Sequence, residues 1–148
     1  MTKAVTVTST REAPTRLSLG LAVLRVVVGI VFAVHGAEKL FTTGIGGVTG
    51  FFTQIGAPLP GVTAPLVSLL EFAGGIALIL GLLTPVVGAL LAIDMLGAIF
   101  LVHLPAGFSA QNGGYEFVLT LFAASLALAL TGPGAYALDA LLGRERAR

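Results

Sequence analysis

The sequence predicts an all-α fold, an integral membrane four-helix bundle with a short interfacial amphipathic helix between its first and second spans. Hydrophobic residues make up 56% of the 148 residues and charged residues only 10%, and glycine, proline and polar residues separate the apolar stretches. The mean hydropathy is +1.02, whereas a soluble domain carries roughly 25% charged residues. Because a surface so poor in charge would aggregate in water, we expect the lipid bilayer to cover much of it.

Both ends of the chain are polar. Residues 1–18 are polar, β-branched and basic, and we expect them to form a disordered cytoplasmic tail. A secretory signal is the competing interpretation, but no small-x-small cleavage site ends the apolar run, because His35 stands where a small residue is needed. We therefore expect an uncleaved first span, a membrane domain over residues 19–142, and a basic cytoplasmic tail over residues 143–148.

The first span is predicted over residues 19–41, which exceeds the roughly 20 residues that a helix needs to cross a bilayer. Spacings of three and four positions place one set of residues on a single face, namely Arg25, Gly29, Phe32, Gly36 and Lys39. Glycines on such a face permit the close approach of a second helix.

The other spans are predicted over residues 65–83, 85–104 and 115–130. Between the first two spans lies an uncharged segment rich in glycine and proline, in which apolar residues recur at helical spacing from Val48 to Ile55. This segment is too short to cross the bilayer, so we expect a short helix that lies in the interface or re-enters it and is ended by glycine and proline.

The positions of the basic residues predict the orientation. Every lysine and arginine outside the spans lies in one of the two tails, and the three connections carry none. The positive-inside rule then places both termini in the cytoplasm, which requires an even number of spans.

A net charge of +1 without a basic stripe argues against nucleic acid as a partner. The chain has no cysteine, which excludes disulfides and thiolate metal sites within it.

Most ionisable groups of the spans are predicted near the outer ends of the helices. At about 1.5 Å per residue, His35 and Glu71 lie about 9 Å below those ends, Asp94 about 15 Å and Arg25 about 24 Å. We expect a polar pocket that opens outward, in which His35, Glu71 and Glu116 are candidates for proton handling. Lys39 is then a candidate to hold an anionic or carbonyl oxygen.

A purely structural interpretation of the same charges stays open. In it Lys39 holds Glu71 in an ion pair, and Arg25 and Asp94 form a second, structural ion pair. Two histidines, His35 and His103, raise the question of a metal. No spacing such as H-x-x-H or H-E-x-x-H occurs, so we expect no metal site.

These residues occur in a pattern that resembles the DoxX family of small four-span bacterial membrane proteins. The matching pieces are HGAEKL at the end of the first span, GAPLPG, LLEFAGGIALILGLLTP, a third span ending at His103, and GGYEF before the last span. The similarity covers roughly residues 19–141. It implies a location in a bacterial inner (plasma) membrane, crossed several times by the chain.

The resemblance also implies a class of activity. Some family members resemble the membrane subunit of a thiosulfate:quinone oxidoreductase, and others are linked to oxidative-stress complexes with soluble redox enzymes. A quinone is thus the implied cofactor. The motif positions carried over as candidate binding or catalytic residues are Gly36, Lys39, Glu71, Gly74, Gly75, His103 and Glu116. Because the chain has no cysteine, a sulfur redox step would need a partner or a bound cofactor.

Three functions therefore stay open. The first is a quinone-linked oxidoreductase subunit, with a carbonyl held by Lys39 or His35 and a proton handled by Glu71. The second is a membrane scaffold that recruits partner enzymes. The third is a small proton or solute transporter, for which four spans would require a homo-oligomer.

Overall fold

The computed structural model describes residues 12–146, and the side chains of residues 15–142. The described chain consists of helices joined by turns and short loops, and it contains no strand between residues 12 and 146. The longer helices are α1 (Glu12–Ala37), α2 (Gly44–Gln54), α3 (Pro60–Leu80), α4 (Thr84–Ala98), α5 (Glu116–Thr131) and α6 (Leu138–Arg146). The short segments are the π-helices η1 (Glu38–Thr43) and η2 (Ile99–His103) and the 3₁₀ turns η3 (Leu104–Ala106) and η4 (Ala110–Asn112).

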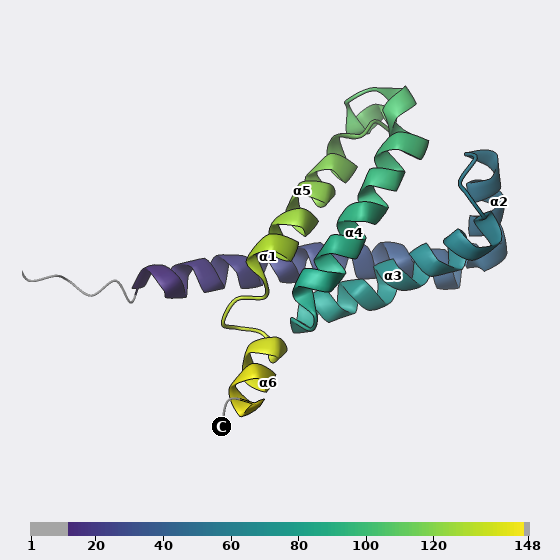
Figure 1. Ribbon diagram of the computed structural model, residues 1–148. Coiled ribbons are helices and arrows are strands. Elements are labelled where there is room, and N and C mark those ends of the chain that lie inside the picture. The colour runs from purple at the N-terminus through teal and green to yellow at the C-terminus, as the bar shows by residue number, and fades with distance from the viewer. Residues whose placement is uncertain (1–11, 147–148) are drawn as a thin grey trace, which may run out of the picture.

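The four long helices form two antiparallel pairs. Helix α1 lies along α3, and α4 lies along α5, with fewer contacts between the pairs than within them. The pairs pack together near the turn that joins α3 to α4, and they diverge toward the end that carries α2 and the α4–α5 connection (Figure 1). The bundle thus has a closely packed end and an open end.

The core lies where the two pairs meet. Phe32 of α1, Leu78 of α3, Leu91 of α4 and Leu128 of α5 are each at most 1% exposed and belong to one cluster. Glycines let α1 approach α3 closely, because a methyl group at Gly75 would overlap the backbone of α1. The packed core separates the two ends of the bundle.

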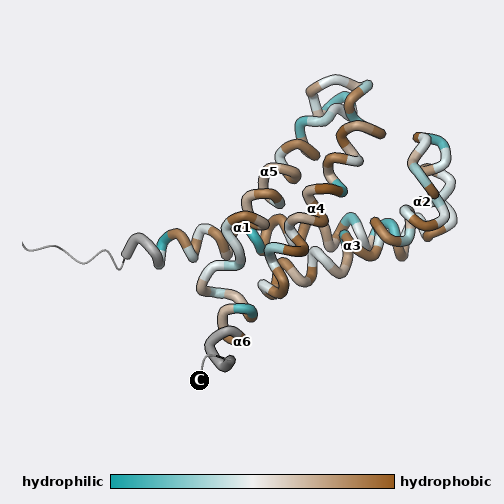
Figure 2. The backbone as a smooth tube through the Cα atoms, viewed as in Figure 1, coloured by the Kyte–Doolittle hydropathy of each residue, from teal (hydrophilic) through white to brown (hydrophobic). Residues whose placement is uncertain are grey.

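The outer surface of the bundle is apolar. Hydrophobic residues run along α3, α4 and α5 (Figure 2), and many large aliphatic side chains are exposed. Three continuous helical stretches are long and apolar enough to cross a bilayer, namely Thr15–Gln54, Pro60–Leu80 and Thr84–Ala106, and Glu116–Thr131 is a shorter apolar helix. This arrangement confirms the predicted all-α membrane bundle and the short helix, α2, between the first two spans.

The helices extend further than the sequence led us to expect. Helix α1 begins at Glu12, so residues 12–18 are helical rather than part of a disordered tail, and residues 1–11 lie outside the described part of the chain. Helix α6 continues through Arg146 into the expected basic tail. The first turn of α1 contains Pro14, a residue that helices accept at their start.

The turn between α3 and α4 closes the packed end. Gly81 has a φ of 73° and ends α3, and Leu83 has a φ of 49° just before α4 begins. A positive φ suits glycine and is uncommon for leucine. Pro85 then occupies the first turn of α4, where the missing N–H has no partner to lose. The backbone is therefore tightly specified at this end.

Candidate functional site

A pocket of about 330 Å³ lies at the open end of the bundle. Its polar wall contains His35, Lys39, Glu71 and His103. Its apolar wall contains Phe32, Met95, Ala98, Phe117, Val118 and Leu121. The structure thus brings together four of the predicted site residues. A mostly apolar pocket of this size with a few convergent polar groups is typical of a small-ligand site.

Lys39 reaches the pocket from the π-helical segment η1, which continues α1. Its ammonium forms an ion pair with the carboxylate of Glu71 in the middle of α3. The Glu71 side chain is 5% exposed and that of Lys39 is 27% exposed. The pair is therefore largely removed from solvent and forms the inner polar wall of the pocket.

His103 also lies in a π-helical segment, η2, which continues α4. Its Nδ1 lies 2.7 Å from the carbonyl oxygen of Gly113, and because a carbonyl only accepts, Nδ1 is the donor of this hydrogen bond. Short π-helical segments inside α-helices occur frequently at functional sites. The two segments place Lys39 and His103 at the same pocket from opposite helix pairs.

His35 stands at the mouth of the pocket. Its side chain is 48% exposed, and its Nδ1 lies 3.6 Å from Oε2 of Glu38, one helical turn further along. Its ring centroid lies 6.3 Å from that of Phe117 on α5. The imidazole of His35 therefore contacts the exposed carboxylate of Glu38 on one side and Phe117 of the apolar wall on the other.

Asp94 of α4 extends the charged cluster beneath the pocket. Both Glu71 and Lys39 interact electrostatically with it, Glu71 more strongly. Its Oδ2 is buried and has no hydrogen-bond partner among the described residues. Two carboxyl groups thus adjoin a single ammonium. The sequence does not predict that Glu71 and Asp94 lie together. The signal that could have indicated it is that each of them is the single carboxylate within its predicted span.

Arg25 does not join this cluster, which corrects the expected Arg25–Asp94 ion pair. Arg25 donates from Nη2 to the carbonyl oxygen of Tyr136 at 2.6 Å and interacts electrostatically with Asp139. It also packs against Gly81 in the α3–α4 turn. The two residues therefore belong to opposite ends of the bundle.

The candidate glycines lie at helix contacts rather than in the pocket wall. A methyl group at Gly36 would overlap the backbone of Phe72, and one at Gly75 would overlap that of Ala33. At Gly74 it would press against Val87. Their role is therefore to let helices approach.

Glu116 lies outside the pocket lining as well. Its Oε2 accepts a hydrogen bond of 2.9 Å from the N–H of Ala110, which fastens the loop before α5. Glu116 is exposed and lies in the first turn of α5, where a carboxylate interacts favourably with the helix dipole.

Among the described residues, no three histidine, aspartate or glutamate side chains gather as metal ligands.

Several known proteins are similar in sequence to this chain over most of its length. CatD of Bacillus subtilis (strain 168), provisionally named an oxidoreductase, is 41% identical over 121 residues, which cover 82% of this chain and 85% of CatD. The inner membrane protein YqjF of Escherichia coli (strain K12) is 36% identical over 129 residues, covering 86% of this chain and 95% of YqjF. An uncharacterized membrane protein of Mycobacterium tuberculosis (strain ATCC 25618 / H37Rv), Rv3486, is 33% identical and covers 82% of this chain and 80% of Rv3486.

No solved structure matches this chain. The sequence model of the DoxX family matches residues 20–104. This range includes most of α1, all of α2, α3 and α4, and the polar residues His35, Lys39, Glu71 and His103. This match and the membrane relatives agree with the all-α bundle and with its apolar surface. The chain is a membrane protein that belongs to the DoxX family.

Proposed function

We propose that this protein binds the ring of a membrane quinone in the pocket at the open end of the bundle, as a subunit of a quinone-linked oxidoreductase. The observation that carries the proposal is the gathering of His35, Lys39, Glu71 and His103 around one pocket with an apolar wall. The name of CatD points to the same class of reaction for that relative.

The pocket suits a flat ring with polar edges. A volume of about 330 Å³ is at the lower end of the range for small-ligand sites, about 300–1,000 Å³, and fits one ring system. Phe117, which is 45% exposed, lies in its wall and offers aromatic surface to the face of a ring. The ammonium of Lys39 and the imidazole of His35 are donors for a carbonyl oxygen.

The charged cluster supplies a route for protons. A bound quinone provides a couple that takes up two electrons and two protons. The carboxyls of Glu71 and Asp94 adjoin a single lysine, so one of the two can hold a proton without leaving the cluster unbalanced. His35, at the pocket mouth, exchanges protons with water. Glu71 would be the residue that supplies a proton to the ring oxygen when a quinone is bound, and Asp94 and His35 would restore that proton.

This function needs an electron donor, which we assign to a soluble redox enzyme; a sulfur-linked step could not use this chain's own residues, because it has no thiol. The positive-inside rule places both termini in the cytoplasm and the pocket in the outer leaflet of the bacterial inner membrane. A scaffold for partner enzymes needs no pocket of this composition. A transporter needs a continuous path, and the packed core around Leu78 and Leu91 stands below the pocket.

The test is to purify the protein in mild detergent and to measure quinone in the organic extract by absorbance and mass spectrometry. The same preparations are titrated with water-soluble benzoquinone and naphthoquinone analogues. We expect binding to the native protein, and a loss of roughly tenfold or more in affinity for Glu71→Gln and His35→Ala. Glu116→Gln is the matched control, because Glu116 lies outside the pocket. Equal binding by all variants, or none by the native protein, would overturn the proposal.

A further inference from the structure

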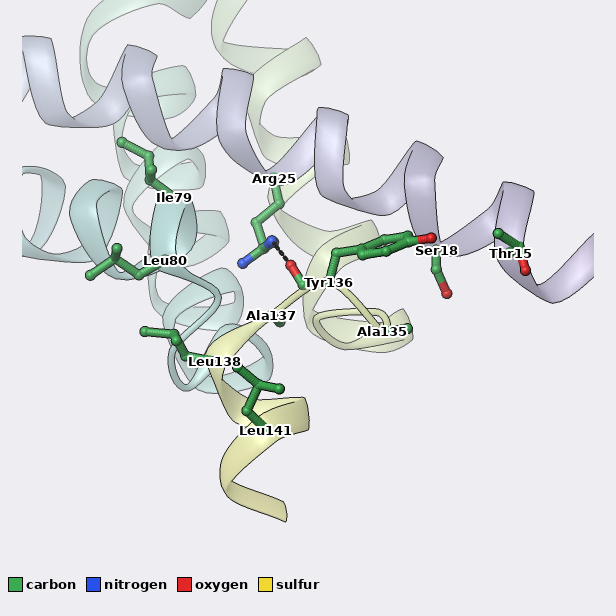
Figure 3. Close-up of a pocket in the computed structure, with 10 residues that line it drawn as sticks. All are labelled: Thr15, Ser18, Arg25, Ile79, Leu80, Ala135, Tyr136, Ala137, Leu138 and Leu141. Atoms are coloured by element: carbon green, nitrogen blue, oxygen red, sulfur yellow. Dashed lines mark hydrogen bonds between the residues drawn. The ribbon is translucent and has the colours of Figure 1, made fainter. Parts of the chain in front are cut away.

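A second cavity, of about 790 Å³, lies at the packed end of the bundle. Residues of α1, of the end of α3 and of the segment that follows α5 form its wall, which includes Arg25, Leu80, Tyr136 and Leu141. Figure 3 shows Arg25 extending from α1 toward this segment, with the ring of Tyr136 running back toward Ser18. The proposed quinone site makes no use of these residues.

The guanidinium of Arg25 is short of partners. Arg25 is 2% exposed, and its Nη2 donates to the carbonyl oxygen of Tyr136 at 2.6 Å (Figure 3). Its Nε and Nη1 are buried and have no hydrogen-bond partner within residues 15–142. A guanidinium has five N–H donors, and leaving a buried charged donor unpaired is costly. The cavity therefore adjoins a cation with unused hydrogen-bonding capacity.

Asp139 balances this charge only in part. It interacts electrostatically with Arg25, yet its Oδ2 lies 3.4 Å from the backbone N–H of Thr84 at the start of α4. A carboxylate at this position also faces the positive end of the α4 dipole. Asp139 is thus shared between a helix N-terminus and Arg25, and it does not occupy the guanidinium donors by hydrogen bonding.

The cavity has the surroundings of a lipid headgroup. Arg25 packs against Gly81 in the α3–α4 turn, so it lies at the level where the bundle ends. Beside it stand aliphatic side chains on the outer surface, and Leu80 and Leu141 are 45% and 55% exposed. The chain termini, which hold every lysine and arginine outside the predicted spans, belong to the same side of the predicted topology. A soluble anion would need no such apolar wall.

We propose that this cavity binds the phosphate of a membrane phospholipid. Arg25 donates to the phosphate oxygens through its free N–H groups, and the hydroxyl of Ser18, which lines the cavity, is a further donor. The acyl chains lie along Leu80 and Leu141 on the outside of the bundle. Bound lipid then ties α1 to the segment after α5, at the end of the molecule opposite to the proposed quinone site.

The test uses the full-length protein in mild detergent. It is titrated with dioctanoyl phosphatidylglycerol, with dioctanoylglycerol, which lacks the phosphate, and with sodium phosphate. Native mass spectrometry counts the bound lipid, and thermal unfolding reports stabilisation. We expect saturable binding of the phospholipid, little binding of the diacylglycerol, and affinity lowered roughly tenfold or more by Arg25→Gln. Saturable stabilisation by sodium phosphate alone, with no gain from the acyl chains, would overturn the lipid assignment in favour of a free phosphate compound.

Two further variants keep the result decisive. Arg16→Gln removes the same charge from an exposed position of α1 and should leave binding unchanged. Ser18→Phe fills the cavity without touching the charge of Arg25, and it should lower binding even where Arg25→Gln does not fold. Native-like phospholipid binding by Ser18→Phe, or an equal loss in Arg16→Gln, would show unspecific attraction of lipid and overturn the proposal.

Discussion

Lys39 and Glu71 form an ion pair that joins the π-helical end of the first span to the middle of α3. The pair connects helices that are also held together by glycine contacts, so its geometry depends on a well-packed interface. Charges inside a membrane bundle are costly unless they are paired. The pair therefore has both a structural and a chemical role, and variants can separate the two.

Breaking this pair should destabilise the protein. Lys39→Met leaves Glu71 buried without its cation, and we expect the free energy of unfolding to fall by about 3 kcal/mol. Combining Lys39→Met with Glu71→Gln removes both charges, so the double variant should lose much less than the sum of the single losses. Chemical or thermal unfolding in detergent measures all three variants. Strictly additive losses would contradict the ion pair.

The close contact of α1 with α3 should not tolerate a methyl group. Gly36→Ala forces Cβ into the backbone of Phe72, and we expect a loss of about 1–3 kcal/mol. Gly20→Ala is the matched control on the same helix, because no atom lies within 4 Å of its added methyl group. That control should be neutral or gain up to about 1 kcal/mol. Equal unfolding temperatures for the two variants would refute the glycine contact.

The charge of Glu71 should matter more to stability than the charge of Asp94. Both carboxyls adjoin one ammonium, but the ion pair joins Lys39 to Glu71. We therefore expect Glu71→Gln to lower the free energy of unfolding more than Asp94→Asn does, because only the first change leaves Lys39 without its ion-pair partner. Chemical or thermal unfolding in detergent measures both variants, and Glu116→Gln, at an exposed position in the first turn of α5, is the control. A larger loss for Asp94→Asn than for Glu71→Gln would contradict this ranking.

Glu116 should affect stability more than ligand binding, although its hydrogen-bond partner Ala110 belongs to the pocket lining. Glu116→Ala removes the acceptor for the N–H of Ala110, and the expected loss is about 1 kcal/mol. Quinone-analogue affinity should fall far less than it does for Glu71→Gln, because Glu116 itself is not in the pocket lining. Gln111→Ala changes a neighbouring exposed residue and serves as the control for loop substitution. A clear fall in affinity for Glu116→Ala would instead return this carboxylate to the candidate proton path.

The depth of each residue along its predicted span is enough to suggest the pocket. The spans predict the same depth for His35 and Glu71, and both residues line the pocket in the structure. The same estimate of depth wrongly predicts an ion pair between Arg25 and Asp94, because depth along a helix axis does not determine which neighbouring helix a side chain faces. Arg25 faces the segment after α5, and Asp94 faces α3.

The π-helical segments could not be read from the sequence. Neither EKLFTT nor IFLVH differs in hydrophobic period from an ordinary helix end. The roles of Gly36 and Gly75 were also ambiguous, since a glycine can border a ligand or another helix. Only the position of the second helix, which depends on packing across the whole bundle, decides between these roles.

The two π-helical segments should lower the free energy of local unfolding at the open end of the bundle relative to the packed end. Both lie at the open end, whereas the α3–α4 turn and its buried contacts lie at the other end. Irregular backbone with fewer buried contacts opens locally at lower free energy than a packed core. Amide hydrogens around Lys39 and His103 should accordingly exchange with deuterium sooner than those around Leu78. A ligand can thus enter the pocket through local unfolding at the open end while the packed end keeps its structure.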